Sequence, residues 1–302
     1  MTGNVGVPKP APFLRWAGGK RKLVPVIESI FPKNWSGETN KFFEPFVGGG
    51  SLMIALGNPE SKHFTPGRNL IINDVNPDLI NTYIAIRDDV ETLIRRLNRF
   101  DGQVSKATYE KIRAMEPRSQ IGIAARFIYL NKTCFNGLWR VNKEGKFNVP
   151  WGKIKNPKIC DSENLRALSL RLQGSIISQN NFAHAVNEAN KNDLIYFDPP
   201  YIPISTSSSF SKYAREGFGL VEQFALAGTI EGLTKKGSHV ILSNSDTVET
   251  REIFGENLYL YQFDVRRSIS ANSSSRVMVK EILATNFNVP SRLLPGTLKP
   301  VN

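Results

Sequence analysis

The chain has 302 residues, of which 40% are hydrophobic and 22% charged, a composition typical of a globular protein with a buried core. No apolar run approaches the roughly 20 residues of a membrane-spanning helix, which excludes such a helix. The 39 Lys and Arg residues exceed the 27 Asp and Glu residues, and the net charge of +12 fits either a phosphate-rich partner or an ordinary basic protein.

Cysteine and histidine usage bears on the compartment and on metals. Cys134 and Cys160 are too few for a disulfide framework, which fits a reducing, cytoplasmic compartment. The three histidines are isolated, and no Cys/His group has zinc-ligand spacing, so we expect no metal site. Residues 1–12 lack the apolar stretch of a secretory signal, and we expect them to form a flexible arm.

Helices and strands are predicted to alternate over the first 76 residues. The expected elements are a helix over 22–27, a strand over 42–46, a helix over 52–56 and a strand over 70–74. The glycine turn Gly48-Gly49-Gly50 separates the first strand from its helix, and Asp74 closes the second strand. This order is typical of a nucleotide-binding α/β sheet.

Residues 77–160 have a different character. They contain 16 Lys and Arg residues against 8 Asp and Glu residues, a net charge of +8. Their apolar periodicity predicts helices over 79–86, 90–99, 109–115 and 121–130. A loop over 131–158, dense in Asn, Gly, Lys and aromatic residues, follows. We interpret this stretch as an inserted helical module with a basic surface.

The remaining chain is predicted to return to the sheet. The expected elements are a helix over 162–172, strands over 174–179 and 193–197, a helix over 222–233 and strands over 239–243 and 258–265. The ending, residues 290–302, is rich in proline, and we expect it to be loose.

The most specific motif is Asp198-Pro199-Pro200-Tyr201, directly after a predicted strand. Two prolines make an extended turn without N–H donors, at the strand end where open α/β sheets bind ligands. The carboxylate and a carbonyl of the turn are acceptors, which suits a planar amino group with two N–H donors. An amino group held in this way can attack an electrophilic methyl group, and Tyr201 offers a face for stacking a base. The alternative is a rigid turn without chemistry.

A second set of residues suits a cofactor. Glycines after a strand permit close approach of a ligand and positive φ angles. The turn lacks the G-x-G-x-x-G pattern of dinucleotide sites. Asp74 can accept hydrogen bonds from ribose hydroxyls, and Lys20 can pair with a cofactor carboxylate. Taken singly, Asp74 equally fits a solvated strand end, and Lys20 equally fits a loop at the start of a helix.

Together these motifs resemble the Dam-type DNA adenine methyltransferases, in which cofactor motifs come first, a recognition domain next and Asp-Pro-Pro-Tyr last. The resemblance covers residues 13–285. The matching segments are Trp16-Ala17-Gly18-Gly19-Lys20, Glu44-Pro45-Phe46-Val47-Gly48, Tyr129-Leu130-Asn131, Asn136-Gly137-Leu138, Phe147-Asn148-Val149-Pro150, Asp198-Pro199-Pro200-Tyr201 and Arg266-Arg267-Ser268-Ile269-Ser270.

The resemblance implies an α/β fold, a Rossmann-like methyltransferase sheet with a mostly helical DNA-recognition insertion. Residues 1–76 and 161–302 would be the two parts of the catalytic domain, and residues 77–160 the helical target-recognition domain. The implied activity is transfer of a methyl group from S-adenosylmethionine to N6 of a flipped adenine in double-stranded DNA, in the sequence GATC. The implied enzyme is a cytoplasmic monomer without a metal ion, acting in the bacterial nucleoid or in a phage-infected cell.

Roles for single residues also follow from the resemblance. The catalytic residues would be Asp198, Pro199 and Tyr201. The cofactor-binding residues would be Trp16, Lys20, Phe46, Gly48, Gly50, Asp74, Phe182 and Asp198. The DNA-binding residues would be Arg15, Lys132, Phe135, Asn136, Leu138, Arg140, Pro150 and Lys153, with the two lysines on phosphates. The forked guanidinium of Arg140 suits the O6/N7 edge of guanine.

Four positions depart from the family pattern. Gly49 replaces a common alanine, Arg15 a common lysine, and Trp151 a common phenylalanine. Phe135 replaces a tyrosine that fills the gap left by the flipped base, and it keeps the ring. These changes leave the chemistry intact and bear on sequence specificity.

Two other functions stay open at the level of the sequence. Methyltransferases acting on RNA bases or on protein glutamines also use an Asp/Asn-Pro-Pro-Tyr turn, although the basic insertion favours duplex DNA. A non-catalytic DNA-binding regulator is a second alternative, against which the intact Asp198, Tyr201, Lys20 and glycine turn argue. The sequence does not indicate whether the enzyme is solitary, restriction-associated or phage-encoded.

Overall fold

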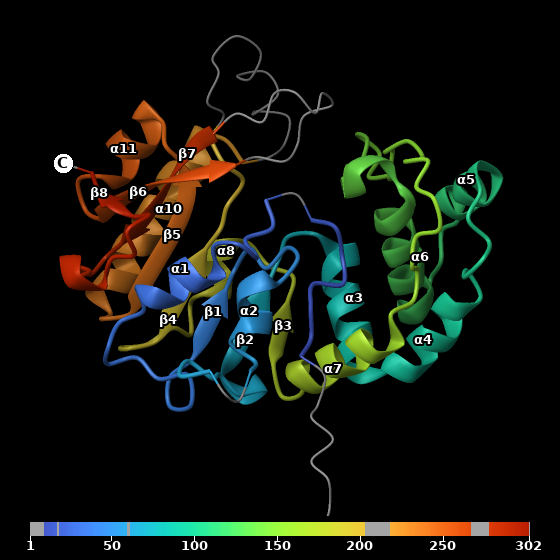
Figure 1. Cartoon of the computed structure of the whole chain (residues 1–302), viewed down its shortest axis with the longest axis horizontal. Coiled ribbons are helices and arrows are strands. Elements are labelled where there is room, and N and C mark those ends of the chain that lie inside the picture. Colours follow the sequence, from blue (N-terminus) through green and yellow to red (C-terminus); the bar gives the residue numbers. More distant parts are fainter. Residues whose placement is uncertain (1–8, 17, 59–60, 203–217, 267–277, 302) are drawn as a thin grey trace, which may run out of the picture. The chain divides into compact units, whose positions relative to one another are not determined.

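Figure 1 shows the computed structural model of the chain, which describes residues 9–16, 18–58, 61–202, 218–266 and 278–301. The chain divides into two compact units, Met1–Val24 with Val47–Asn180 and Pro25–Phe46 with Asn181–Asn302. The first eight residues of the predicted arm, Ala17 and the motif residues 267–270 lie outside the described residues. The predicted domain boundaries at residues 76 and 160 stay a prediction.

The first unit is mostly helical in its described part. Its strands β2 (Leu70–Asn73) and β3 (Ile176–Ser178) pair in parallel. Its helices are α2 (Ser51–Ala55), α3 (Pro77–Asp88), α4 (Val90–Asn98), α5 (Lys106–Ala114), α6 (Gln120–Thr133) and α7 (Ser162–Leu172), with short 3₁₀ turns η1 (Gly67–Asn69) and η2 (Phe135–Gly137). Helix α3 packs against α6 and α7.

Side-chain caps explain where four of these helices, α3 to α6, begin. Asn76 accepts hydrogen bonds from two backbone N–H groups at 3.0 and 3.2 Å, and Pro77 occupies the first position of α3. Asp89, Ser105 and Ser119 cap α4, α5 and α6 in the same way. Each cap satisfies an N–H group that the first turn of a helix leaves unpaired.

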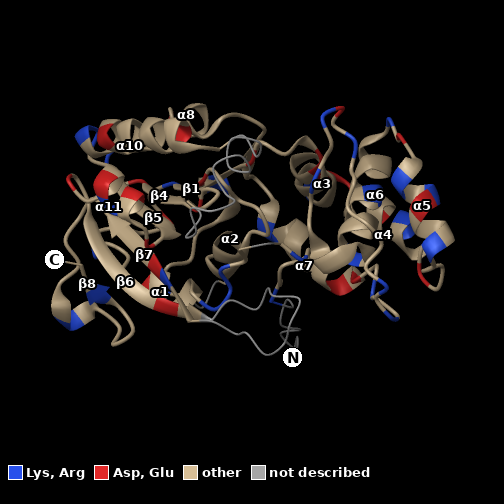
Figure 2. Ribbon diagram, turned by 90° about the horizontal axis from the view of Figure 1, so that it is seen from above, with Lys and Arg blue, Asp and Glu red and all other residues tan. Residues whose placement is uncertain are grey.

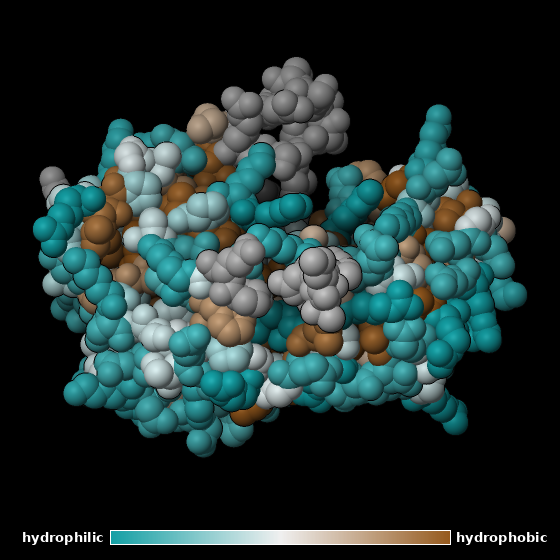
Figure 3. Space-filling model, turned by 60° about the horizontal axis from the view of Figure 1, so that its bottom comes forward, coloured by the Kyte–Doolittle hydropathy of each residue, from teal (hydrophilic) through white to brown (hydrophobic). Residues whose placement is uncertain are grey.

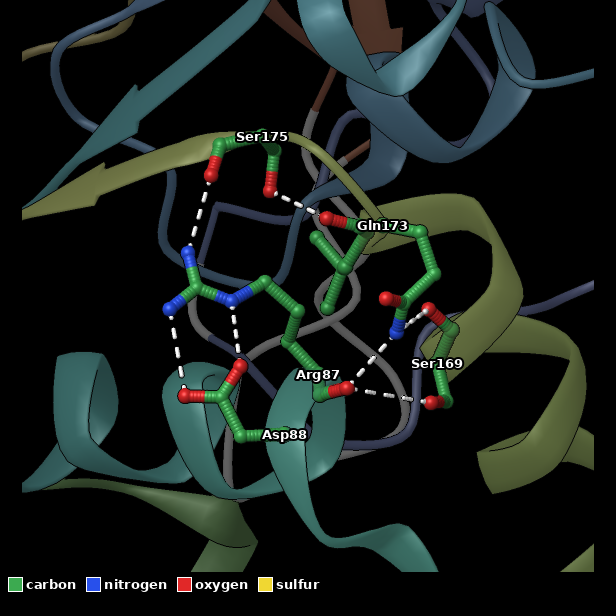
Figure 4. A network of polar contacts seen from close by, with 6 residues as sticks. Arg87, Asp88, Ser169, Gln173 and Ser175 are labelled. Atoms are coloured by element: carbon green, nitrogen blue, oxygen red, sulfur yellow. Dashed lines mark hydrogen bonds and ion pairs between the residues drawn. The ribbon is translucent and has the colours of Figure 1, made fainter.

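A polar network joins the end of α3 to the chain around β3 (Figure 4). The guanidinium of Arg87 donates two hydrogen bonds to Asp88 and one, of 2.8 Å, to the Ser175 carbonyl. The carbonyl of Arg87 accepts from Gln173 at 2.7 Å and from Ser169 at 3.4 Å. The network thus fixes the last turn of α3 against the end of α7.

The second unit contains strands β1 (Phe42–Glu44), β4 (Leu194–Phe197), β5 (His239–Ser245), β6 (Tyr259–Arg266), β7 (Met278–Thr285) and β8 (Lys299–Pro300), in the order β1-β4-β5-β7-β6-β8. The first three are parallel, whereas β7 is antiparallel to β5 and β6, and β8 is antiparallel to β6. Its helices are α1 (Val24–Ser29), α8 (Phe182–Ala185), α10 (Leu220–Lys235) and α11 (Val248–Phe254), with a 3₁₀ turn η3 (Ser291–Leu293).

Strand β4 lies between two parallel neighbours, and all four of its residues are buried. A continuous apolar run is typical of a parallel strand that is covered on both faces. The parallel order β1-β4-β5 with helices confirms the predicted α/β class. None of the described helices is both long and apolar enough to cross a membrane. The face in Figure 3 is mostly hydrophilic, with apolar residues in small patches.

Several local expectations are corrected by the structure. The arm is not free at its described end, because Ala11 exchanges two hydrogen bonds with Asn164. The ending is not loose either, because it forms η3 and β8, and Val301 donates a hydrogen bond to the Leu260 carbonyl. The first helix begins at Val24, two residues later than predicted, since turns occupy the preceding residues.

Candidate active site

The turn Asp198-Pro199-Pro200-Tyr201 leaves the carboxyl end of β4, as predicted. Side chains of two other elements hold it. Gln223 of α10 donates a 3.1 Å hydrogen bond to the Pro200 carbonyl, and Ser243 of β5 donates one of 2.7 Å to Oδ1 of Asp198. The backbone of Ile202 donates to Asn244 at 3.3 Å and accepts from the hydroxyl of Ser245. The turn is therefore fixed at both ends.

These supporting residues were not predicted from the sequence. Gln223, Ser243, Asn244 and Ser245 are fully buried, and the strand was expected to end at Ser243. A signal was present in the sequence, because three polar residues directly follow the apolar part of the strand. In the structure, the register of this strand pairs Leu242 with Phe197. Parallel strands end at the same edge of a sheet, so these residues lie next to the turn.

The buried Tyr196, the half-buried Tyr201 and an acid lie near the carboxylate of Asp198. The Tyr201 hydroxyl donates a 3.2 Å hydrogen bond to Glu281, which is 5% exposed on β7. Burial, followed by the charges of Asp198 and Glu281, raises the pKa of Tyr201 well above its usual value. Burial and Asp198 raise the pKa of Tyr196 in the same way. Both phenols therefore keep their protons at neutral pH.

Three phenylalanines of the second unit form an aromatic cluster. Phe46 stacks on Phe182 with ring centroids 5.6 Å apart and planes 28° apart. Phe218 meets both rings edge-on, at 5.5 Å from Phe46 and 5.8 Å from Phe182. The structure thus brings together Phe46 and Phe182, two of the predicted cofactor-binding residues, and adds Phe218. A planar ligand could bind such a cluster through its faces.

The glycine turn belongs to the first unit. Gly48 and Gly50 have φ angles of 45° and 66°, which favour glycine. A Cβ atom on Gly48 would lie 2.7 Å from the Trp16 ring, and one on Gly50 would lie 2.7 Å from the Tyr83 hydroxyl. Packing of these side chains therefore also demands glycine, a reason that the sequence did not reveal.

Asp74 lies just beyond β2 and faces this turn. Its Oδ2 accepts a 3.1 Å hydrogen bond from the N–H of Gly48, and its Oδ1 accepts one of 3.0 Å from Asn76. Burial raises its pKa, although these backbone donors act in the opposite direction. The backbone of Val75 is a third donor to this carboxylate, which offers about four lone-pair sites and so retains capacity for a further donor. Lys20 is 8% exposed, and its ammonium donates to the Gly18 carbonyl at 2.9 Å.

Asn131, at the end of α6, joins the N-terminal motif to the recognition segment, by which we mean residues 131–158. Its Oδ1 accepts from the Arg15 N–H at 2.9 Å, and its Nδ2 donates to the carbonyls of Arg15 and Gly137 at 2.8 and 3.1 Å. Asn131 is fully buried. Arg15 itself is exposed, and its Cβ leaves no room for a side chain on Gly137. The structure thus places Arg15 beside η2.

An aromatic row continues from this point through the first unit. The ring centroids of Trp16 and Phe127 are 6.2 Å apart, those of Phe127 and Trp139 4.1 Å, and those of Trp139 and Phe147 4.5 Å. The row links the packing of the glycine turn to that of the recognition segment.

Most of the predicted base-reading residues are exposed on the recognition segment. Phe135 is 46% exposed, and its N–H donates to the Pro150 carbonyl at 2.9 Å. Asn136 is exposed with a φ of 54°, and Leu138 is half-buried. Pro150 is exposed as well. Figure 2 shows basic residues on α5, α6 and the neighbouring loops.

Arg140 begins a small hairpin within the recognition segment. Val141 and Phe147 form an antiparallel bridge, and the Asn148 N–H donates to the Arg140 carbonyl at 3.0 Å. Nε of Arg140 donates a 2.7 Å hydrogen bond to Oδ1 of Asn148. This contact orients an exposed guanidinium, which is a bidentate donor.

The two predicted phosphate-binding lysines have different surroundings. The ammonium of Lys132 donates to the carbonyls of Lys158 and Ile159, both at 3.0 Å, and burial lowers its pKa. One of its three N–H groups is left for another acceptor. Lys153 is exposed, with a φ of 53°. In the part of the chain that the structure describes, no three His, Cys, Asp or Glu side chains gather as metal ligands do.

Comparison with known proteins places this geometry in context. Residues 16–269 match the family model of the D12 class N6 adenine-specific DNA methyltransferases. The type II methyltransferase M1.LlaDCHI of Lactococcus lactis subsp. cremoris is 38% identical over 91% of this chain and 95% of its own. The type II methyltransferase M.MjaIII of Methanocaldococcus jannaschii is 36% identical over 91% and 99%, and the DNA adenine methylase of Escherichia coli K12 34% over 90% and 94%.

Proposed function

The chain belongs to the D12 class N6 adenine-specific DNA methyltransferases, and from this premise we propose that it methylates N6 of a flipped adenine in GATC sites of duplex DNA, with S-adenosylmethionine as cofactor. The observation that carries the proposal is the Asp198 carboxylate, fixed by Ser243 at the end of β4. The Escherichia coli relative is named a DNA adenine methylase, and the family is one of DNA methyltransferases, which favours DNA over RNA or protein glutamine as substrate and catalysis over a purely regulatory role.

Asp198, Pro199 and Tyr201 would hold the target base. A carboxylate oxygen of Asp198 and the carbonyl of Pro199 can each accept one N–H of the adenine amino group, which orients the nitrogen lone pair. The ring of Tyr201 would stack on the base. The base must leave the helix, because N6 inside a stacked pair is out of reach of a methyl donor.

The cofactor side chains fit an adenosyl group in their chemistry. Asp74 has acceptor capacity for ribose hydroxyls, and Phe46 and Phe182 offer stacked rings. We propose that Trp16, Lys20, Gly48 and Gly50 complete the set, with Lys20 paired to the cofactor carboxylate. When bound, S-adenosylmethionine supplies an electrophilic methyl group.

Residues 77–160 would form the target-recognition domain between the two parts of the catalytic domain, 1–76 and 161–302. Asn136, Leu138, Arg140 and Pro150 would approach the bases, with Arg15 near a flanking base, Phe135 in the gap left by adenine, and Lys132 and Lys153 on phosphates. The oriented guanidinium of Arg140 supports reading of the outer guanine of GATC. We propose that the enzyme acts as a monomer in the bacterial cytoplasm, where the DNA lies.

Methyl transfer to short duplexes that carry GATC or each single-base variant tests the proposal. Asp198→Ala should lower turnover by at least about a thousand-fold, since the target amine loses its main acceptor, while DNA affinity stays within a few-fold. Asp264→Ala, which removes an exposed acid of the same unit, is the control and should retain turnover. Equal rates on GATC and on duplexes changed at the outer guanine would reject the GATC site, and a fully active Asp198→Ala would reject the catalytic assignment.

A further inference from the structure

Two buried residues of the second unit form a chain of hydrogen bonds that ends on Asp198, which is half-buried. The hydroxyl of Tyr196 lies 3.0 Å from that of Ser243, and the Ser243 hydroxyl donates at 2.7 Å to Oδ1 of Asp198. Tyr196 is 1% exposed and Ser243 fully buried. The three residues come from adjacent strands, since Tyr196 and Asp198 belong to β4 and its end, and Ser243 to β5.

The direction of this chain follows from the chemistry of its members. An ionised carboxylate only accepts, so the single proton of Ser243 is directed at Asp198. Because the Ser243 proton is used in this way, the Tyr196 hydroxyl is the donor in the hydrogen bond between Tyr196 and Ser243. Burial and the charge of Asp198 raise the pKa of Tyr196 well above its usual value, so this phenol keeps its proton. The chain therefore points donors toward Asp198.

Ser243 differs in its partner from the two residues that follow it. Asn244 and Ser245 bind the backbone of Ile202 and so position the turn. Ser243 binds a side-chain oxygen, and so acts on the rotation of the carboxylate about its Cβ–Cγ bond.

We propose that Ser243 is a positioning residue for methyl transfer, which fixes the orientation of the Asp198 carboxylate as an acceptor for the adenine amino group. This inference rests on the proposed function. It assigns Ser243 an effect on the chemical step and none on DNA affinity.

The test compares Ser243→Ala, Ser243→Cys and Tyr196→Phe with the parent enzyme on a GATC duplex. Ser243→Ala should lower kcat by about ten- to a hundred-fold, the effect of losing a hydrogen bond to a charged group. KM for DNA should stay within a few-fold. Ser243→Cys keeps a weak donor and should be intermediate. Tyr196→Phe leaves the Ser243 donor in place and should lower kcat less than about five-fold.

Ser238→Ala is the matched control. Ser238 is 2% exposed just before β5, and its hydroxyl donates to the Asn190 carbonyl at 2.7 Å, so it reports the loss of a buried serine hydroxyl away from the turn. This variant should keep the parent kcat. Melting curves establish that each variant is folded, and Ser243→Cys carries the test if the alanine variant unfolds.

A parent-like kcat in Ser243→Ala would overturn the inference, and so would an equal loss in Ser238→Ala. If Asp198→Ala is inactive and Ser243→Ala is unchanged, only this inference fails, whereas an active Asp198→Ala removes the proposed function itself.

Discussion

The proposed catalytic turn, residues 198–202, and the recognition segment, residues 131–158, are both irregular chain, but they are held differently. Buried side chains of α10 and β5 bind the turn through its carbonyls, its N–H and its carboxylate. The recognition segment is held mainly by its own backbone, through bridges such as Val141 with Phe147 and Cys134 with Trp151. Its proposed reading residues Phe135, Asn136 and Arg140 are exposed.

This difference indicates how the proposed chemistry and the proposed reading of the DNA sequence are divided between two segments of the chain. A buried polar network fixes its members together, because removing one partner leaves the others unsatisfied. Replacing an exposed side chain on a backbone scaffold usually changes the free energy of unfolding little. We therefore expect substitutions in the recognition segment to alter the target sequence and substitutions around the turn to alter the rate. Three predictions sharpen or break this comparison.

Asn131 is the exception, and it should have the largest effect on stability. It is buried inside the recognition segment and makes three hydrogen bonds to backbone groups of Arg15 and Gly137. Asn131→Ala should lower the free energy of unfolding by about 3 kcal/mol, since these groups lose their partners. Asn142→Ala, at an exposed turn of the hairpin, should cost less than about 1 kcal/mol. Urea unfolding measures both, and equal costs would show that burial of Asn131 has no special effect.

Arg140 should control base discrimination at the outer guanine. Arg140→Ala should lose about 1–3 kcal/mol of discrimination there, measured as the ratio of kcat/KM on GATC and on variants at that position. Asn148→Ala should lose a smaller part, because Asn148 only orients the guanidinium. Arg118→Ala, which removes another exposed arginine of the first unit, should leave the ratio unchanged. A parent-like ratio in Arg140→Ala would contradict the assignment.

Variants of Lys153 and Lys132 should distinguish a role in phosphate binding from a role in stability. Lys153→Ala and Lys132→Ala should each flatten the slope of log K against log salt by roughly 0.9, the effect of one phosphate contact. Lys132→Ala should in addition lower stability by about 1 kcal/mol, because two carbonyls lose their donor. A parent slope in Lys132→Ala with reduced stability would make Lys132 a structural residue alone.

The sequence predicts the parts of this fold that depend on local patterns. Helix α7 and strand β4 follow from apolar periodicity, and the Asp198 turn from its two prolines. The sequence does not reveal β7, α11 or the polar end of β5, because these depend on partners distant in the chain. Ser243 lies 45 residues from Asp198, and Asn131 lies 116 residues from Arg15. No local pattern marks such a contact.

The way β1 joins the second unit has a consequence for synthesis. Phe42 pairs with Leu194, and Lys41 donates a hydrogen bond to Asp193, 152 residues later in the chain. A ribosome that adds about 5–20 residues per second needs roughly 10–30 seconds to make that stretch. During this time the first unit can be completed, while β1 has no β4 with which to pair. We expect the second unit to fold last, after β8 near the end of the chain has left the ribosome.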